Sequence, residues 1–264
     1  MNKIKVLIEQ LKIKTNKEHQ IKILQNINTL LLTRYKLKID ENFIIHPIQV
    51  EGYYYDDRHF KDDTVHKSEL QKNKFGKLYF HRKGKNKSSK ILFTRSGIDI
   101  CLSDNDNYFY SALIRSARIN NEESIIDGPQ RLAQRIYRYI CKNDNLSSLS
   151  IGNNSSLSEF EKNNVVLVNS ETREIPILIH SSRIGLKKGS DYSALKLRSL
   201  TELRVSKQKE KDVLFYMEDN NIDPTPDNIR NILGYSPNWI IEQLNSIKFL
   251  PTTINDALTG NVTD

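Results

Sequence analysis

The feature that most constrains the fold is a series of segments between residues 43 and 119 that are rich in β-branched and aromatic side chains. Clusters of Gly, Asn, Asp and Ser separate them, a pattern typical of strands joined by turns. The strand candidates run from Phe43 to Tyr55, Lys77 to Arg82, Lys90 to Leu102 and Tyr108 to Ile119. Pro47 lacks a backbone N–H, which predicts that the first segment is an edge strand or begins after Pro47. The middle of the chain is therefore predicted to be mostly sheet.

Helical periodicity flanks this sheet region. Apolar residues three and four positions apart predict two amphipathic helices near the start of the chain, a helix from Pro129 to about Cys141, and further helices after residue 200. Two short apolar runs at 165–168 and 175–179 predict strands, and the Asn- and Ser-rich stretch 143–158 predicts a connection. We expect N-terminal helices at 1–42, an α+β domain at 43–200 with a curved, mainly antiparallel sheet flanked by helices, and a helical extension at 201–264.

The C-terminal extension carries clear helix boundary signals. Thr225-Pro226 and Ser236-Pro237 each read as an N-cap followed by a first-turn proline, and Gly234 ends the helix between them. Two short helices that meet at a glycine-containing turn outline a helix-turn-helix over Thr225 to Ile247. The alternative is that both helices simply pack on the core.

Composition and charge narrow the class of protein. The 40 Lys and Arg against 32 Asp and Glu give a net charge of +8, which favours an anionic partner such as nucleic acid. The two cysteines, Cys101 and Cys141, are far apart, and no apolar run approaches the ~20 residues of a membrane span, so a cytoplasmic protein without a membrane partner is expected. The histidine and aspartate spacings match no recurrent ligand motif, and no phosphate-binding glycine loop occurs, so neither metal nor cofactor is expected.

Glu51 is the acid with the most unusual sequence context. It follows a strongly apolar strand in the tract VEGYYY, where a lone carboxylate would be partly desolvated and suited to activating water. The alternative is a glutamate on the solvent face of an edge strand. Arg115 lies in another apolar run, SALIRSARI, and a half-buried guanidinium needs an acidic partner. Glu51 is the natural candidate for that partner.

Seven short tracts, two of which contain Glu51 and Arg115, occur one after another along the chain. They are Glu51-Gly52-Tyr53, Asp62 to His66, Gly76 to Tyr79, Ser96 to Ser103, Leu113 to Ser116, Gly128-Pro129, and Ser182 to Gly185 continuing to Lys196 to Arg198. Together they cover about Ile48 to Leu200. In this order the tracts resemble those of the alkyladenine (3-methyladenine) DNA glycosylase family, enzymes that flip a base out of DNA and hydrolyse its N-glycosidic bond.

The resemblance implies roles for individual residues. Glu51 would be the general base and Arg115 would help to hold the attacking water, while Tyr53 and His66 would form walls of the base pocket. The alternatives are a core tyrosine at 53 and a surface histidine at 66. Tyr79 and Arg183 would also lie on the substrate side. An aromatic wall suits a flat, electron-poor purine. The implied function is base excision in DNA repair, with a modified or damaged purine as substrate and no cofactor.

Two departures from the family pattern leave the substrate open. Ser96 stands where the family has an intercalating tyrosine, and Ser103 where it has a pocket asparagine. A serine cannot wedge base pairs apart. Duplex DNA, single-stranded DNA and a free nucleotide therefore all remain candidate substrates. The basic stretch 82–90 can supply phosphate contacts or form a solvated hairpin tip. The alternative function is a non-catalytic nucleic-acid-binding protein on a glycosylase scaffold.

Overall fold

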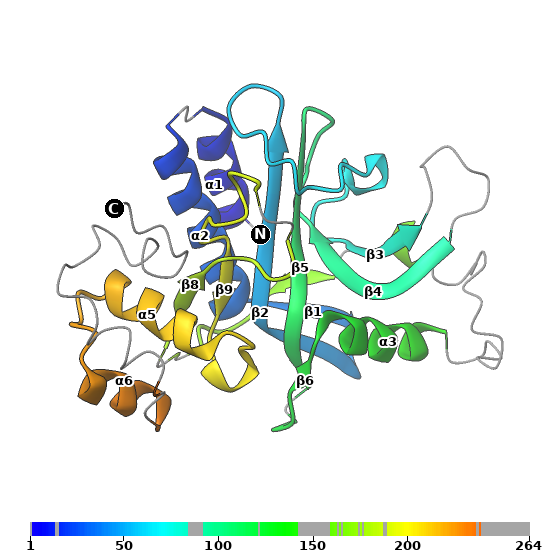
Figure 1. The fold of residues 1–264 in the computed structure, drawn as a ribbon. Coiled ribbons are helices and arrows are strands. Elements are labelled where there is room, and N and C mark those ends of the chain that lie inside the picture. Colours follow the sequence, from blue (N-terminus) through cyan, green and yellow to red (C-terminus); the bar gives the residue numbers. More distant parts are fainter. Residues whose placement is uncertain are drawn as a thin grey trace.

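One curled antiparallel sheet organises the molecule (Figure 1). The computed structural model describes residues 2–13, 16–83, 92–120, 122–141, 159–162, 164, 166–173, 175, 177–186, 189–235 and 238. Among these, the main path of the sheet is β3 (Leu78–Lys83), β4 (Leu92–Cys101), β5 (Tyr108–Ile119), β2 (Phe43–Asp56), β1 (Tyr35–Asp40) and β7 (Leu167–Asn169). In addition, β6 (Ile126–Asp127) pairs with β5, and β9 (Arg198–Leu200) joins β2 to β8 (Ile179–Ser181). The predicted α+β class, with helices flanking a curved antiparallel sheet, is confirmed.

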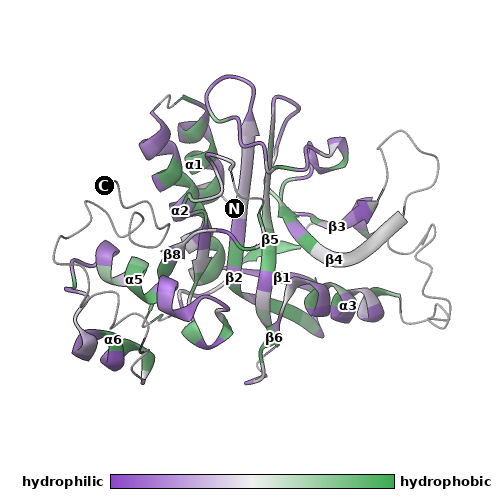
Figure 2. Ribbon diagram, in the orientation of Figure 1, coloured by the Kyte–Doolittle hydropathy of each residue, from purple (hydrophilic) through white to green (hydrophobic). Residues whose placement is uncertain are grey.

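Three helices cover one face of the sheet and enclose the main core. They are α1 (Asn2–Ile13), α2 (Lys17–Thr33) and α3 (Pro129–Ile140), and the Asn16 side chain caps α2 by accepting from the N–H groups of Glu18 and His19. Their apolar sides meet alternate residues of the central strands, and Figure 2 shows apolar residues gathered where α1 and α2 meet the sheet. These three helices do not cover the opposite face of the sheet.

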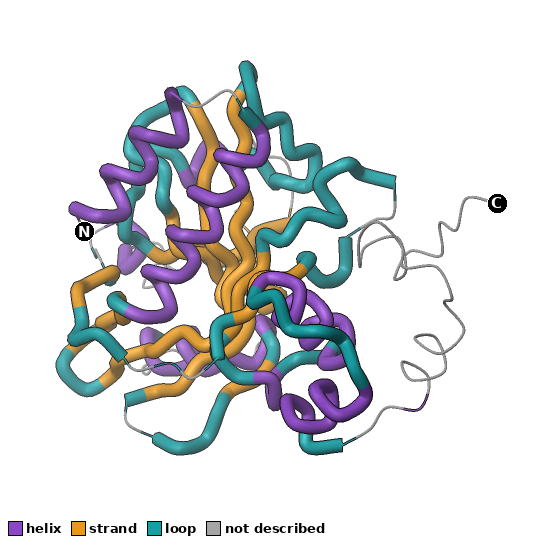
Figure 3. Tube along the Cα trace, turned by 90° about the vertical axis from the view of Figure 1, so that its left-hand side faces the viewer, coloured by secondary structure: helices purple, strands orange, loops and turns teal. Residues whose placement is uncertain are grey.

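A second, smaller cluster joins the C-terminal helices. In Figure 3 the strands run through the middle of the molecule, and helices pack against them. Helices α5 (Lys209–Asp219) and α6 (Pro226–Leu233) share buried Val213, Leu214, Met217 and Ile229. Thr225 caps α6 and Gly234 ends it with a φ of +80°, so both predicted boundary signals are confirmed. The second helix of the predicted helix-turn-helix falls almost wholly outside the described residues.

The predicted end of the N-terminal helical segment is wrong. The N-terminal helical segment does not extend to residue 42: α2 ends at Thr33, and Tyr35–Asp40 form strand β1. Tyr35 and Leu37 point into the core while the lysines between them are more exposed, a period of two that suits a strand between β2 and β7. Elsewhere, the described residues contain strands β7 and β8 near the two predicted apolar runs, whereas 142–158 and 84–91 lie outside the described residues.

The prediction for Pro47 is also wrong, because Pro47 lies inside the central strand β2. Pairing of β2 with β1 ends at Ile45, and pairing with β9 begins at Gln49, so the missing N–H of Pro47 falls between two partners. The register with β5 shifts on both sides of Gln49: Ile48 is the extra residue on β2, and Arg115 is the extra residue on β5. Such bulges bend a strand and redirect side chains. The sequence showed the proline but not the bulges that accommodate it.

Within the described ranges, the helices are all too short or too polar to span a lipid bilayer.

Candidate active site

A row of side chains crosses the sheet on the face opposite α1 and α2. Glu51 on β2 stands opposite Leu113 on β5, and Leu113 stands opposite Asp99 on β4. Directly paired residues of antiparallel strands point to the same side, and so does the residue two positions further along each strand. Tyr53 therefore joins Glu51 on this face. The sheet register alone places polar residues of β2 and β4 on one face, on either side of Leu113.

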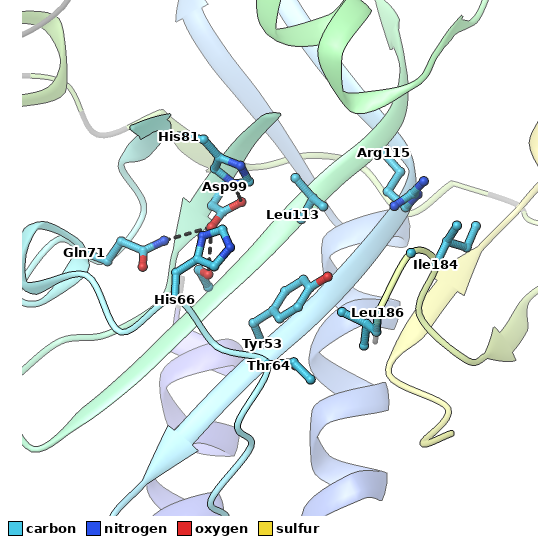
Figure 4. A pocket seen from close by; sticks show the side chains of 12 residues that line it. Tyr53, Thr64, His66, Gln71, His81, Asp99, Leu113, Arg115, Ile184 and Leu186 are labelled. Carbon is cyan, nitrogen blue, oxygen red and sulfur yellow. Dashed lines mark hydrogen bonds and ion pairs between the residues drawn. The ribbon is translucent and has the colours of Figure 1, made fainter. Parts of the chain in front are cut away.

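These side chains border a cavity of about 220 Å³. Loops after β2 and after β8 close it, and Figure 4 shows Tyr53, His66, Asp99 and Arg115 arranged around it. A volume below the roughly 300–1,000 Å³ of clefts for drug-sized ligands suits a single small ring system. The lining residues are Tyr53, Thr64, His66, Gln71, His81, Asp99, Ser111, Leu113, Arg115, Ile184, Gly185 and Leu186.

Glu51 lies directly behind the wall of this cavity. Its side chain is fully buried, and three donors that line the cavity bind its carboxylate. The Tyr53 hydroxyl donates at 2.9 Å, the Ile184 N–H at 2.8 Å and the Arg115 guanidinium at 3.3 Å. Burial and the adjacent Glu51 charge raise the pKa of Tyr53 well above its usual value, so Tyr53 keeps its proton. Arg115 reaches Glu51 from the bulge on β5.

The loop that supplies the Ile184 N–H is held by a second buried ion pair. Arg183 donates to Asp62 at 2.7 Å and to the Gly52 carbonyl at 3.3 Å, and its guanidinium stacks 4.7 Å from the centre of the Tyr53 ring. Gly185 follows with a φ of +81°, a conformation that favours glycine. Arg183 thus fixes both Tyr53 and the backbone that binds Glu51.

A third ion pair, between Asp99 and His81, lines the other side of the cavity. The Asp99 carboxylate lies 2.8 Å from His81 Nε2 and accepts hydrogen bonds from Gln71 at 2.8 Å and Ser111 at 3.0 Å (Figure 4). Burial alone would raise the pKa of Asp99, but His81 and the bound donors outweigh it and lower that pKa. Burial likewise opposes the charge of His81, but Asp99 outweighs it and raises the pKa of His81. The His66 ring packs against His81, with 5.3 Å between ring centres.

Gly97 makes room for this pair. A Cβ atom at position 97 would lie 2.9 Å from Leu113 Cδ1 and 3.0 Å from His81 Cε1. Both distances are too short for ordinary packing. The glycine of the Ser96–Ser103 tract is therefore needed for the approach of the His81 ring to β4.

The structure brings together most, but not all, of the site residues expected from the sequence. Tyr53, His66 and Arg115 line the cavity, Glu51 lies behind it, and Arg183 supports it. Three others lie outside the lining. Tyr79 is buried next to His81, and Ser96 is exposed on β4. Ser103 is buried, and its hydroxyl forms hydrogen bonds with the backbone of Tyr110.

The sequence did not assign five polar lining residues to the site, namely Thr64, Gln71, His81, Asp99 and Ser111. The available signal was an acid between the apolar residues Ile98 and Ile100, which alternation places on the same face as Gly97. Its pairing with His81 depends on the register of β3 against β4, which the sequence does not display.

The described residues contain no group of three or more His, Cys, Asp and Glu side chains able to hold a metal ion. Comparison of the sequence with models of protein families and with curated proteins gives no match. The resemblance to the alkyladenine DNA glycosylase family therefore stays a prediction.

Proposed function

We propose that this protein is a glycosylase-like hydrolase that cleaves the N-glycosidic bond of a modified or damaged purine in DNA. The observation that carries the proposal is a fully buried carboxylate, Glu51, whose donors Tyr53, Arg115 and Ile184 all line a cavity the size of one base. An enzyme that hydrolyses this bond must hold the base outside the stack and activate a water beside the sugar. The net charge of +8 favours a nucleic-acid substrate.

The geometry suggests how the proton of the attacking water reaches Glu51. The oxygen of the water bonds to the anomeric carbon as the C–N bond breaks, and the base leaves with the electron pair of that bond and takes up a proton from solvent. The Arg115 guanidinium and the Ile184 N–H donate hydrogen bonds to Glu51, but neither group can accept a proton from the water. The Tyr53 hydroxyl can accept the proton of the water while it donates its own to Glu51. Tyr53 then acts as a relay as well as a wall of the pocket.

The test is abasic-site formation on oligonucleotides, single-stranded and duplex, that carry one alkylated or deaminated purine. Glu51→Gln is expected to lower base release by about 10²- to 10⁴-fold, the usual contribution of a general base. Tyr53→Phe retains the aromatic wall and removes the relay, so it is expected to fall within the same range.

Glu161→Gln is the matched control. Glu161 is also a buried glutamate bound by an arginine, Arg82, but it does not line the cavity. Activity that survives Glu51→Gln would disprove the mechanism. Oligonucleotide binding without base release from any member of the panel would favour the non-catalytic nucleic-acid-binding alternative.

A further inference from the structure

Helix α3 carries a row of exposed arginines on its outer side. Arg131, Arg135 and Arg138 are all exposed, and their spacing of four and three residues places them on one side of the helix. Leu132 and Ile136 are fully buried on the other side and belong to the main core. The three arginines, which we call the arginine surface, therefore point away from the sheet.

The arginine surface has no acidic residue on its own helix. α3 contains three arginines and neither Asp nor Glu, whereas α1, α2, α5 and α6 each contain at least one of these acids. Figure 2 shows hydrophilic residues along this helix. Like charges three or four residues apart repel each other and destabilise a helix. The charge of α3 is therefore balanced neither within the helix nor by its spacing.

Acids that lie beside α3 do not balance this charge. Asp127, which precedes the helix, accepts a hydrogen bond from Ser116 at 2.8 Å, and Asp40 accepts one from the Tyr139 hydroxyl at 2.6 Å. Among the residues that the structure describes, none of the three arginines belongs to an ion pair. Their guanidinium groups are thus left to bind an anion from outside the molecule.

The central arginine is partly ordered by an aromatic pair. The Arg135 guanidinium lies 6.0 Å from the centre of the Phe43 ring, and the Phe43 and Tyr139 ring centres are 4.2 Å apart. A guanidinium that lies over an aromatic ring keeps its N–H groups free to donate at its edge. An arginine that is ordered before binding also loses less side-chain entropy when it binds.

We propose that the arginine surface of α3 binds the phosphate backbone of nucleic acid, at a place separate from the cavity and without reading the base sequence. Along the helix axis, Arg135 lies about 6 Å and Arg138 about 10.5 Å from Arg131. One strand of a duplex carries one phosphate per ~3.4 Å of its axis, so a regular row of cations suits this regularly charged polymer. The proposal goes beyond the proposed function, because binding here requires no base release.

The arginine surface and the cavity lie on different sides of the sheet. α3 packs on β4 and β5 together with the main core, whereas the cavity is bordered by side chains of the opposite face (Figure 1). Contacts from arginine to phosphate hold a protein on nucleic acid but carry no sequence information. The arginine surface would therefore raise affinity for any nucleic acid and leave the choice of base to the cavity.

The experiment measures binding to two unmodified duplex oligonucleotides of unrelated sequence over a series of salt concentrations. A triple variant, Arg131→Gln, Arg135→Gln and Arg138→Gln, is expected to bind both duplexes about ten- to a hundredfold more weakly at about 0.1 M salt. The slope of log affinity against log salt concentration is expected to fall by about 2 to 3, or roughly one for each lost phosphate contact.

Two matched variants separate the position of the charge from its amount. Lys3→Gln, Lys22→Gln and Lys207→Gln together remove the same charge from exposed positions outside α3, and this variant is expected to change the slope by less than about 1. Replacing all three arginines with lysine keeps the charge on α3 and is expected to keep the slope. Thermal melting of each variant checks that it folds.

The outcomes distinguish this proposal from the hydrolase proposal. No binding by the wild type at low salt, equal losses in the two glutamine triple variants, or a lysine variant as weak as its glutamine counterpart would each overturn the role of the arginine surface. Base release that depends on Glu51 would still support the hydrolase. A salt slope that depends on the arginine surface, without base release from any substrate, would support this proposal and count against the hydrolase.

Discussion

Two arginine–carboxylate pairs lie on neighbouring strands, and their surroundings differ completely. Glu51 on β2 stands directly opposite Arg198 on β9. Glu51 is bound by Arg115 at the edge of a cavity, whereas Arg198 is bound to Asp212 of α5 with both side chains fully buried. Ser181 and Ser206 also donate to Asp212, and Arg198 donates to the Ser182 carbonyl. The same residue types thus build a cavity wall in one place and a closed junction in the other.

The surroundings of the two pairs distinguish a candidate site from a structural junction in this fold. The Arg198–Asp212 pair ties α5 to strands β8 and β9, and its further hydrogen-bond partners are the Ser181 hydroxyl and the Ser182 carbonyl. The Arg115–Glu51 pair has protein on one side and a void of about 220 Å³ on the other. Burial of a charge alone does not mark a candidate site; burial beside a cavity does.

Breaking the fully buried Arg198–Asp212 pair is expected to have the largest effect on the free energy of unfolding. Asp212→Ala leaves Arg198 buried without its carboxylate, and removing one partner of such a pair costs about 3–5 kcal/mol of unfolding free energy. Urea denaturation measures this loss. Glu218→Ala is the control, because Glu218 pairs with Lys196 near the surface of the same helix, where an ion pair contributes about 0–1 kcal/mol. Equal losses for the two variants would contradict the distinction.

Two histidines with opposite pKa shifts provide a second comparison between a residue that lines the cavity and one that does not. Burial, together with Lys22 and Lys196, lowers the pKa of His180 to about 4, while Asp99 raises the pKa of His81. The unfolded chain takes up a proton at His180 near pH 6.5 and the folded protein does not, so stability falls as pH drops from about 6.5 to about 4 and then levels off. For His81 the contribution is complete below pH 6.5 and is lost as pH rises through its raised pKa.

The His180 effect is expected to reach about 3 kcal/mol, from 2.5 pH units at 1.36 kcal/mol each. Urea denaturation of the wild type and His180→Gln at pH 7.5, 5.5 and 4 measures it. The variant is expected to lose less stability than the wild type over this range. Parallel losses would show that the pKa of His180 is not lowered in the folded protein, and NMR titration of both histidine rings would locate the discrepancy.

The sequence predicts the parts of this fold that depend on local signals. The Tyr108–Ile119 strand, the α3 start at Pro129 and both ends of α6 follow from residue types within a few positions. The alternation that places Glu51 and Tyr53 on one face is also local. Local signals alone leave Glu51 open as a residue on the solvent face, and the order of the seven tracts is what made it a candidate.

The rest depends on contacts between residues far apart in the chain. Arg115 points into the cavity because a bulge on β5 redirects it, and nothing in SALIRSARI marks that bulge. Asp99 meets His81 through the β3–β4 register and meets Gln71 through a loop closure. Ser103 looked like a pocket residue by its position in a tract, yet its hydroxyl is bonded to Tyr110. Long-range register and loop packing, not composition, decide which side chains line this side of the cavity.

The smallest predicted effect tests whether the cavity face tolerates one added methyl group. Gly97→Ala places a Cβ about 3 Å from His81 and Leu113, which must shift, and such overpacking costs about 1–3 kcal/mol. We expect the lower half of that range, because the His81 ring lines the cavity and can move into it. Moving His81 away from Asp99 also lowers the pKa of His81 towards 6.5, which NMR titration detects.

Ser96→Ala, at an exposed residue of the same strand, is the control and is expected to change the free energy of unfolding by less than about 0.5 kcal/mol. A His81 pKa unchanged in Gly97→Ala would mean that the glycine does not control the approach of His81 to Asp99, and that the pair owes its position to the loop that carries Gln71.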